Sequence, residues 1–250
     1  MGTVGFKWSC VVVGMGLGAI FLLSQRIYSA GLELHRGSDE IHPAVTEIVA
    51  RMVAYRRWQD DALREYQARR TFRAATQRFN MDSTLEVRTI FRWPYSMQST
   101  VLRQEGSGFV REHVFEKILE AETEFASKDD ADIIPKNYDF ALIGKEDCDG
   151  RRCWHLSLIP KRKDKYLLDG DVWVDTTDYG ISRVHGSPSK RVSIWVSNVD
   201  IDKRMRRIEG IWLPEKLDST SSIRFAGSVS MQIEYIYDVV TVVSPSTARK

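Results

Sequence analysis

The sequence predicts an α+β fold, in which one large curved antiparallel sheet of about ten strands carries two main helices on one face. Two observations support this prediction. From residue 138 to residue 243, short runs of alternating apolar and polar residues are separated by turn residues. Before that region, two segments repeat apolar residues at helical spacing, with strand-like runs between them. The order of helix, strands, helix and strands leaves both helices available to cover one face of the sheet.

The N-terminal residues predict export from the cytoplasm. Lys7 precedes an uncharged run from residue 8 to residue 23, and the next charge is Arg26. A secretory signal has an apolar core of about 7–15 residues, whereas a membrane-spanning helix needs about 20. We therefore expect residues 1–30 to be a signal peptide. The alternative is an uncleaved segment whose residues 8–23 tether the protein to a membrane.

The first helix is predicted within residues 38–66. Ser38 or Asp39 can cap its N-terminus, and acidic residues precede arginines along it, which suits the helix dipole. Residues 66–79 are ambiguous, because helix propensity favours continuation while their apolar side chains also alternate as in a strand. The alternating positions are Tyr66, Ala68, Phe72 and Ala74.

The next segments predict two strands and the second helix. In residues 83–92 the apolar side chains fall on one face and the charged ones on the other, which is typical of a half-buried antiparallel strand. Pro94 interrupts this strand, and residues 95–106 predict the next one. Residues 108–127 repeat apolar side chains at helical spacing.

The remaining strands are predicted between residues 138 and 243. In the last of them Met231, Ile233, Tyr235, Tyr237 and Val239 share one face. Residues 244–250 predict a flexible tail. We therefore expect a single domain over residues 38–243.

Two cysteines flank a predicted turn and indicate a disulfide. Cys148 and Cys153 are separated by Asp-Gly-Arg-Arg, and two nearby thiols usually bond in an oxidising compartment. Such a pair can face across a hairpin, where the Cα atoms must be about 5.5–6 Å apart. A zinc site needs four ligands, and Cys148, Cys153 and His155 supply three at most. Free thiols, a metal site and a redox pair remain the alternatives.

Motifs of known enzymes are missing from the sequence. It contains no G-x-S-x-G, H-E-x-x-H, Walker A or G-x-G-x-x-G motif. The close aspartates of residues 169–178 do not follow the order of a calcium loop. We therefore expect no catalytic residues, no metal and no cofactor. An enzyme whose site assembles only in three dimensions remains an alternative. The scattered histidines are His35, His42, His113, His155 and His185.

The charge balance argues against a nucleic-acid partner. The chain has 36 Lys and Arg against 34 Asp and Glu, a net charge of +2. Arginine is dense between Arg51 and Arg78, and a second basic run extends from Lys161 to Lys165. The simplest interpretation of both is a solvated face; contact with anionic headgroups or an acidic partner is the alternative.

The second half of the chain resembles exported bacterial proteins of the outer-membrane lipoprotein-sorting type, the LolA-like proteins. The features in common are "CWHLSLIPKRK", "GDVWVD", "DYGISRVHGSP" and "GIWLPEKLDS", before a closing "EYIYDV". The resemblance implies an open half-barrel whose helices cover the concave face. It also implies that residues 66–79 form the first strand. The implied role is to shield acyl chains in transit through the periplasm.

The order of elements and the resemblance together lead us to expect a monomeric, non-catalytic carrier or chaperone for a lipid or an acylated lipoprotein. An apolar concavity suffices for this, because each buried CH₂ contributes about 0.8 kcal/mol. A tether through residues 8–23 would hold it at the inner membrane. An envelope-stress sensor of the same fold, which binds an inner- or outer-membrane protein, is the alternative function.

The predicted lining of the concavity comes from the early strands, the second helix as a lid, and the last strand. Plain core packing is the alternative interpretation for each of its members. They are Leu85, Val87, Phe91 and Trp93, then Ile118 and Phe125, then Tyr235 and Tyr237.

Overall fold

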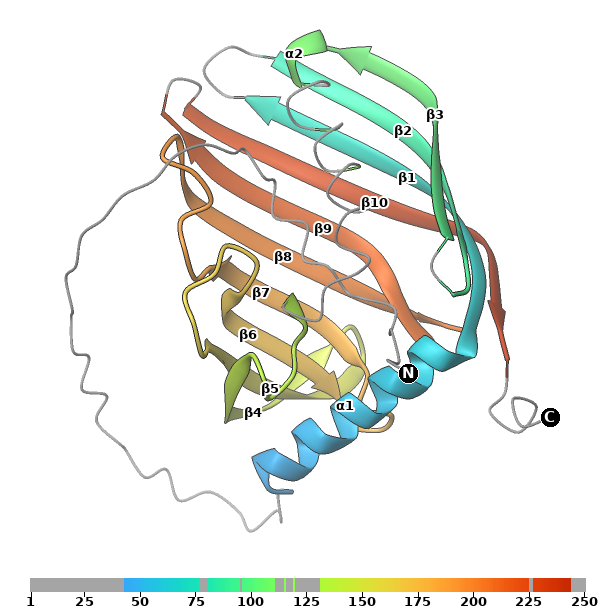
Figure 1. Ribbon diagram of the computed structural model, residues 1–250, viewed down its shortest axis with the longest axis vertical. Helices are drawn as coiled ribbons and strands as arrows, with labels where there is room; N and C mark the ends of the chain where they lie inside the picture. The colour runs from blue at the N-terminus through green and yellow to red at the C-terminus, as the bar shows by residue number, and fades with distance from the viewer. Residues whose placement is uncertain are drawn as a thin grey trace.

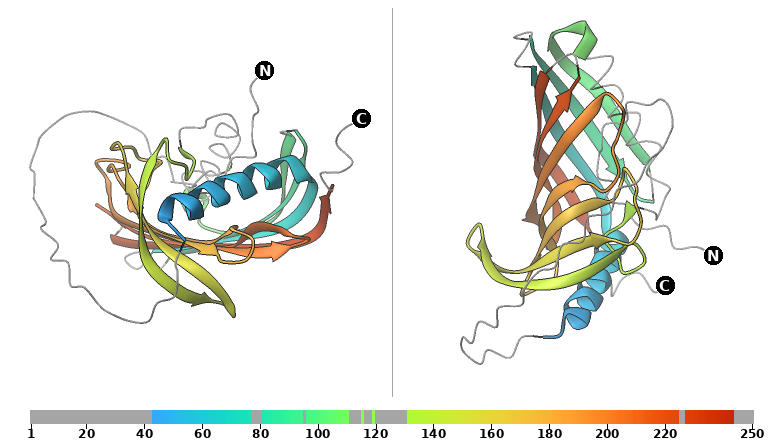
Figure 2. Two further views of the ribbon diagram at one scale, coloured as in Figure 1. Left: turned by 90° about the horizontal axis from the view of Figure 1, so that it is seen from below. Right: turned by 90° about the vertical axis from the view of Figure 1, so that its left-hand side faces the viewer.

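Ten antiparallel strands form one open sheet in the computed structural model (Figure 1). The structure describes residues 43–76, 81–94, 96–110, 115, 119, 131–224 and 227–243 of the 250-residue chain. The strands follow the order β3-β2-β1-β10-β9-β8-β7-β6-β5-β4, so β3 and β4 are the edges. The sheet is strongly curved, with α1 on its concave side (Figure 2). The predicted curved antiparallel sheet is confirmed.

Most strands pair with their neighbours in sequence, and the pairing of β1 with β10 joins the two ends of the chain. The strand bounds are β1 Leu63–Thr76, β2 Met81–Arg92, β3 Ser96–Gly106, β4 Tyr138–Cys148, β5 Arg151–Pro160, β6 Leu168–Asp175, β7 Ile181–Pro188, β8 Val196–Ile208, β9 Ile211–Ile223 and β10 Gly227–Val242.

Helix α1 spans Val45–Ala62 and passes directly into β1 at Leu63. Its capping residue is Ala44, and the caps expected at Ser38 and Asp39 lie outside the described residues. Of the ambiguous residues after the helix, 66–76 belong to β1, as the resemblance implied, and 77–79 lie outside the described residues. Their helix propensity is overridden because β1 lies between β2 and β10 and pairs with both along its length.

The second predicted helix is described only in part. Gly108–Val110 form the short helix α2, and Phe115 and Leu119 are the other described residues of this segment. Within the described ranges, α1 is therefore the one long helix, where two were expected. No helix in those ranges is both long and apolar enough to cross a membrane. The expected signal segment and the C-terminal tail lie outside them.

The core occupies the concave face. Leu85, Phe72, Ile233 and Leu217 lie opposite one another on β2, β1, β10 and β9, and all four are buried. Residues Ile48, Val49 and Met52 of α1 belong to the same hydrophobic cluster. Because side chains alternate across a strand, the residues next to this row point to the convex face and are mostly polar.

Candidate functional site

The concave face of β1, β2, β3 and β10 brings together most of the described members of the predicted lining. Leu85 and Val87 are buried on β2, and both belong to the main core cluster. Phe115, from the segment after β3, packs against Phe72 of β1 with the ring centroids 5.8 Å apart. Phe115, which follows β3 in the chain, thus covers part of the apolar face of β1.

Four aromatic rings continue this face toward the end of β2. Tyr66 stacks on Phe91 with centroids 5.3 Å apart and meets Tyr237 edge-on at 5.6 Å. Tyr235 lies 6.4 Å from Tyr237 with nearly parallel rings. The hydroxyl of Tyr237 donates a hydrogen bond of 2.8 Å to the carbonyl of Pro214, and burial raises the pKa of this tyrosine well above its ordinary value. Through Tyr66, Phe91 joins Tyr237 and Tyr235 in one aromatic surface.

Trp93 does not join the other predicted lining residues. It follows the last residue of β2, and its side chain is 51% exposed. The guanidinium of Arg64 lies over its ring, 4.9 Å from the centroid. Alternation along β2 cannot orient this side chain because the strand ends at Arg92. Ile118 and Phe125, the expected lid residues, lie outside the described residues.

The concave face opens at the edge strand β3. Val101 of β3 pairs with the fully buried Val87, yet Val101 is 51% exposed. Ser99 pairs with the buried Thr89 and is itself exposed. The exposed Val101 and Ser99 therefore form a rim that continues directly into the buried part of the face.

A buried arginine lies just inside this rim. Arg70 is 3% exposed and sits on the same face of β1 as Phe72. Its guanidinium lies 5.1 Å from the ring centroid of Phe72 and 5.8 Å from that of Tyr235. Its Nη2 donates a hydrogen bond of 3.4 Å to Ser99 Oγ. Arg70 was not among the lining residues expected from the sequence, although alternation from Ala68 to Phe72 would have placed it on this face.

The other half of the concave face is held closed by α1. Gln59 Nε2 donates to the Trp212 carbonyl at 3.1 Å, and the Trp212 backbone N–H donates to Gln59 Oε1 at 2.7 Å. The Tyr55 hydroxyl donates to the Gly210 carbonyl at 2.6 Å. These bonds fix α1 to β9 and to the β8–β9 turn, so the cover over this half is part of the folded core.

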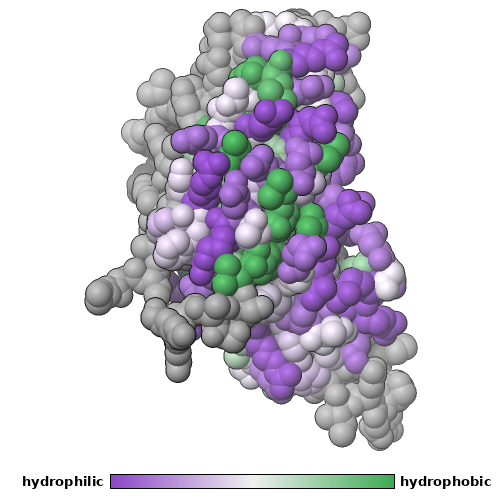
Figure 3. Space-filling model, turned by 90° about the vertical axis from the view of Figure 1, so that its right-hand side faces the viewer, coloured by the Kyte–Doolittle hydropathy of each residue, from purple (hydrophilic) through white to green (hydrophobic). Residues whose placement is uncertain are grey.

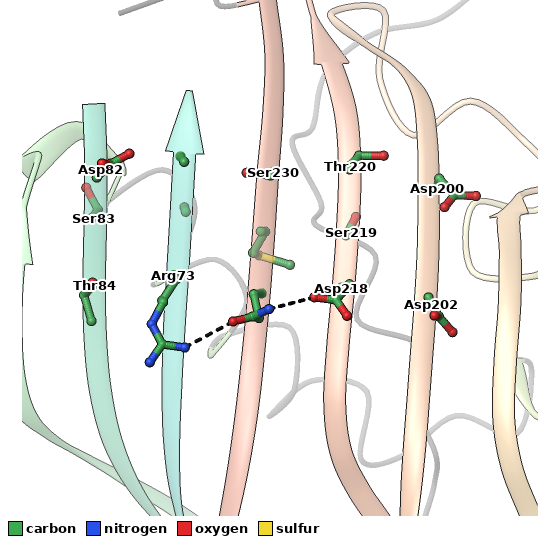
Figure 4. A pocket seen from close by; sticks show the side chains of 14 residues that line it. Arg73, Asp82, Ser83, Thr84, Asp200, Asp202, Asp218, Ser219, Thr220 and Ser230 are labelled. Atoms are coloured by element: carbon green, nitrogen blue, oxygen red, sulfur yellow. Dashed lines mark hydrogen bonds between the residues drawn. The ribbon is translucent and has the colours of Figure 1, made fainter. Parts of the chain in front are cut away.

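A hollow is lined mainly by convex-face side chains of β1, β2, β8, β9 and β10 (Figure 4). Its volume is about 550 Å³. Arg73 Nη1 donates to Gln232 Oε1 at 3.1 Å, and Gln232 Nε2 donates to Asp218 Oδ1 at 2.9 Å. Its lining includes Asp82, Asp200, Asp202 and Asp218. Because four of its lining residues are aspartates, this hollow is unsuited to the anionic head of a lipid.

Apolar side chains are also exposed on the outside of the sheet. Figure 3 shows one side of the molecule, where apolar side chains gather in small patches between polar ones. Ile236 and Val239 of β10 are exposed. Charged neighbours separate such residues, as in the ion pair of 3.8 Å between Arg69 and Asp238.

The predicted disulfide is absent from this structure, in which Cys148 and Cys153 are free thiols. Cys148 lies opposite Arg151 and Cys153 lies opposite Glu146, so the cysteines occupy diagonal positions of the hairpin. A diagonal pair is farther apart than residues directly opposite each other. Cys153 Sγ lies 3.2 Å from Ser182 Oγ, and burial raises the pKa of the Cys153 thiol.

His155 is held by carboxylates close to these cysteines. Its Nδ1 lies 2.7 Å from Glu146 Oε1, and its Nε2 lies 3.1 Å from Asp171 Oδ1. Its ring stacks on Trp173 at 4.5 Å. The hydrogen bond from Trp173 Nε1, with that of His155, holds the pKa of Glu146 below its usual range. Among the described residues, no three His, Cys, Asp or Glu side chains are arranged to hold a metal ion.

Comparison with known proteins finds similarity in solved structures. No family model matches the chain. No curated protein matches it either. A domain described as an outer membrane lipoprotein-sorting protein from Vibrio parahaemolyticus is 12% identical, with 80% of this chain and 92% of that one covered and a TM-score of 0.40. A LolA superfamily protein from Nitrosomonas europaea is 12% identical, with 81% and 95% covered and a TM-score of 0.37.

A third similar structure is a DUF1329 family protein from Desulfovibrio piger. It is 16% identical, with 77% of this chain and 91% of that one covered and a TM-score of 0.38. Solved structures described as LolA superfamily and lipoprotein-sorting proteins are thus among those similar to this chain. Because the identities and TM-scores are low, the function must be argued from this chain's own residues.

Proposed function

We propose that this protein binds an acyl chain of a lipid or lipoprotein against the concave face of β1, β2, β3 and β10. The observation that carries the proposal is the apolar surface that runs from the exposed Val101 at the rim to the buried Val87 and Leu85. Each CH₂ group removed from water there contributes about 0.8 kcal/mol, so a long acyl chain needs no catalytic or metal contact to bind.

The two halves of the concave face suit different roles. Bonds from Gln59 and Tyr55 hold α1 over the half near β9, so that half serves as the fixed core. Over β1, Phe115 contributes one aromatic contact to Phe72. An acyl chain that enters at the β3 rim would replace the contact of Phe115 with Phe72.

The polar end of the ligand has a natural partner near the same rim. The guanidinium of Arg70 is buried beside Ser99, which is exposed. A planar guanidinium matches the geometry of carboxylate and phosphate groups. We therefore expect the ligand's anionic head to lie near Ser99 and its chain to extend along Val87 and Leu85 toward the aromatic surface of Phe91, Tyr235 and Tyr237.

In this proposal the protein is a monomeric periplasmic carrier or chaperone without catalytic activity or a cofactor. Residues 1–30 direct its export, and residues 38–243 form the binding domain. A lipid or an acylated lipoprotein is its cargo.

The test is uptake of a fluorescent fatty-acyl probe by the purified protein. Val101→Asp places a charge on the apolar rim at an exposed position, so the fold should persist while probe affinity falls about tenfold or more. Ile236→Asp is the matched control, because Ile236 is 58% exposed on β10 and lies outside the rim. Equal affinity of the two variants, or no uptake by the wild type, would contradict the proposal.

A partner-binding module is the second candidate, and the edge strand β3 favours it. β3 is exposed at nearly every position from Ser96 to Gly106, so its outer edge can accept a strand of another protein. An envelope sensor that binds a membrane protein would use such an edge. Capture of a membrane protein by the wild type, and its loss when Thr100→Pro blocks the edge, would favour this candidate if the acyl probe is not taken up.

A further inference from the structure

Two loops at one end of the sheet bring six cations together. The β5–β6 connection and the β7–β8 connection both lie at the end of the sheet where β5 and β7 finish. We name their cations the basic loop surface: Lys161, Arg162, Lys163, Lys165, Lys190 and Arg191. Acyl-chain binding on the concave face makes no use of these residues.

Ser189 ties the two connections into one surface. Its backbone N–H donates to the Leu167 carbonyl at 2.7 Å. Its hydroxyl donates to the Asp164 carbonyl at 3.0 Å and accepts from the Asp164 backbone N–H at 3.0 Å. The cations of the two connections are therefore held next to each other by the backbone.

Acidic residues offset only part of this positive charge. Lys161 lies 3.3 Å from Asp139, and Arg162 lies 3.7 Å from Asp164. Lys163, Lys190 and Arg191 are exposed to solvent. The basic loop surface thus keeps an excess of positive charge that faces outward.

Two large apolar side chains are exposed on the same β7–β8 connection. Ile194 is 52% exposed and Trp195 is 42% exposed, close in sequence to Arg191. Arg224, at the end of β9, donates its backbone N–H to the Trp195 carbonyl at 3.0 Å, and its guanidinium lies 5.7 Å from the indole centroid. Trp195 is therefore a positioned side chain with the guanidinium of Arg224 beside its ring.

We propose that the basic loop surface, with Ile194 and Trp195, docks onto a bilayer that contains anionic lipid. Each lysine or arginine near an anionic leaflet strengthens membrane binding about fivefold. Tryptophan favours the boundary between headgroups and acyl chains. A solvated basic loop accounts for the lysines but not for the exposed Ile194 and Trp195 on the same connection. This inference goes beyond acyl-chain binding and does not depend on it.

Flotation of the full-length protein with vesicles tests the contribution of the cations to bilayer docking. We expect binding to vesicles of phosphatidylcholine mixed with phosphatidylglycerol, weak binding to phosphatidylcholine alone, and loss of binding at high salt. Lys190→Gln combined with Arg191→Gln should weaken binding about thirtyfold. The matched control is Arg88→Gln combined with Arg206→Gln, because both arginines are exposed on other parts of the sheet. The control should bind as the wild type does.

Ile194→Ser tests the contribution of the exposed apolar side chains to bilayer docking. It should weaken vesicle binding about tenfold, because the isoleucine no longer enters the interface. Ile143→Ser, at another exposed isoleucine, should leave binding unchanged. The proposal would be overturned if the wild type did not bind anionic vesicles at low salt. It would also be overturned if the variants and their controls lost vesicle binding to the same extent. Uptake of the soluble acyl probe should be the same in all of these variants, so a failure here is separable from a failure of acyl-chain binding.

Discussion

Phe115 packs against Phe72 on the concave face of the sheet, with the two ring centroids 5.8 Å apart. Phe72 belongs to β1, the third strand from the β3 edge of the sheet, whereas Phe115 follows β3 in the chain. Both side chains are buried. The contact is where Phe115 meets the surface on which we expect the acyl chain to lie.

Phe115→Ala should lower the free energy of unfolding by about 3 kcal/mol, because it removes a buried ring and leaves a cavity. A bound acyl chain can fill that cavity. The difference in stability between the wild type and the variant should therefore shrink when a saturating acyl probe is present. Chemical denaturation with and without the probe measures this. A difference that the probe leaves unchanged would show that the ligand does not occupy the space beside Phe72.

Gln59→Ala should destabilise the fold by about 3 kcal/mol without affecting acyl-probe binding. The substitution leaves the buried N–H and carbonyl of Trp212 without the partner that now serves both. Gln67→Ala is the control, since the amide of Gln67 donates only to the neighbouring Glu65 at 3.1 Å. Denaturation midpoints of the two variants check the prediction. A loss of less than about 1 kcal/mol at Gln59 would mean that this pair of bonds does not hold α1 in place.

Asp60 should make the protein less stable as the pH rises toward neutrality. Burial, helped by Asp132 and Asp61 and opposed by Arg56, raises the pKa of Asp60 to about 8 from an ordinary 3.8. Between these values the folded chain keeps a proton that the unfolded chain has released. The contribution of Asp60 to the free energy of unfolding is greatest below about pH 4. It falls by about 1.4 kcal/mol per pH unit as the pH rises to about 8.

Asp60→Asn removes this titration, so the variant should have a flatter dependence of unfolding free energy on pH across that window. Asp61→Asn is the control, because Asp61 is the exposed neighbour and should keep the slope of the wild type. Denaturation at about pH 5 and about pH 7 measures both slopes. Parallel slopes for the wild type and Asp60→Asn would contradict the assignment.

The disulfide between Cys148 and Cys153 remains a prediction for the protein in an oxidising compartment, although the structure has free thiols. Intact mass of the exported protein, before and after reduction and alkylation, counts the thiols. If the bond forms, its short loop should contribute roughly 2 kcal/mol, and Cys148→Ser should lose that amount only under oxidising conditions. Two alkylatable thiols in the unreduced exported protein would rule the bond out.

The face of a strand on which each side chain lies could be predicted from the sequence. Leu85, Val87 and Phe91 fall on one face of β2 because side chains alternate, and Tyr235 and Tyr237 do so on β10. The prediction was wrong where the strand ended. Trp93 follows the last residue of β2, and the turn there exposes its side chain.

Contacts between distant segments could not be predicted from periodicity. The pairing of Phe72 with Ile233 depends on the register of β1 against β10, which lie near opposite ends of the domain. The bonds of Gln59 to Trp212 also join segments far apart in sequence. Arg70 was missed because a charged residue in an alternating run was assumed to face solvent, whereas its position in β1 places it inside.

Mass spectrometry of the protein purified from a periplasm decides whether it carries an acyl chain. The protein is measured first in its native state and then after organic extraction. Acyl-chain binding predicts a stoichiometric phospholipid or acylated peptide that is retained in the native state and released by the solvent. An empty protein that also fails to take up the fluorescent acyl probe would contradict the account and would favour the partner-binding module.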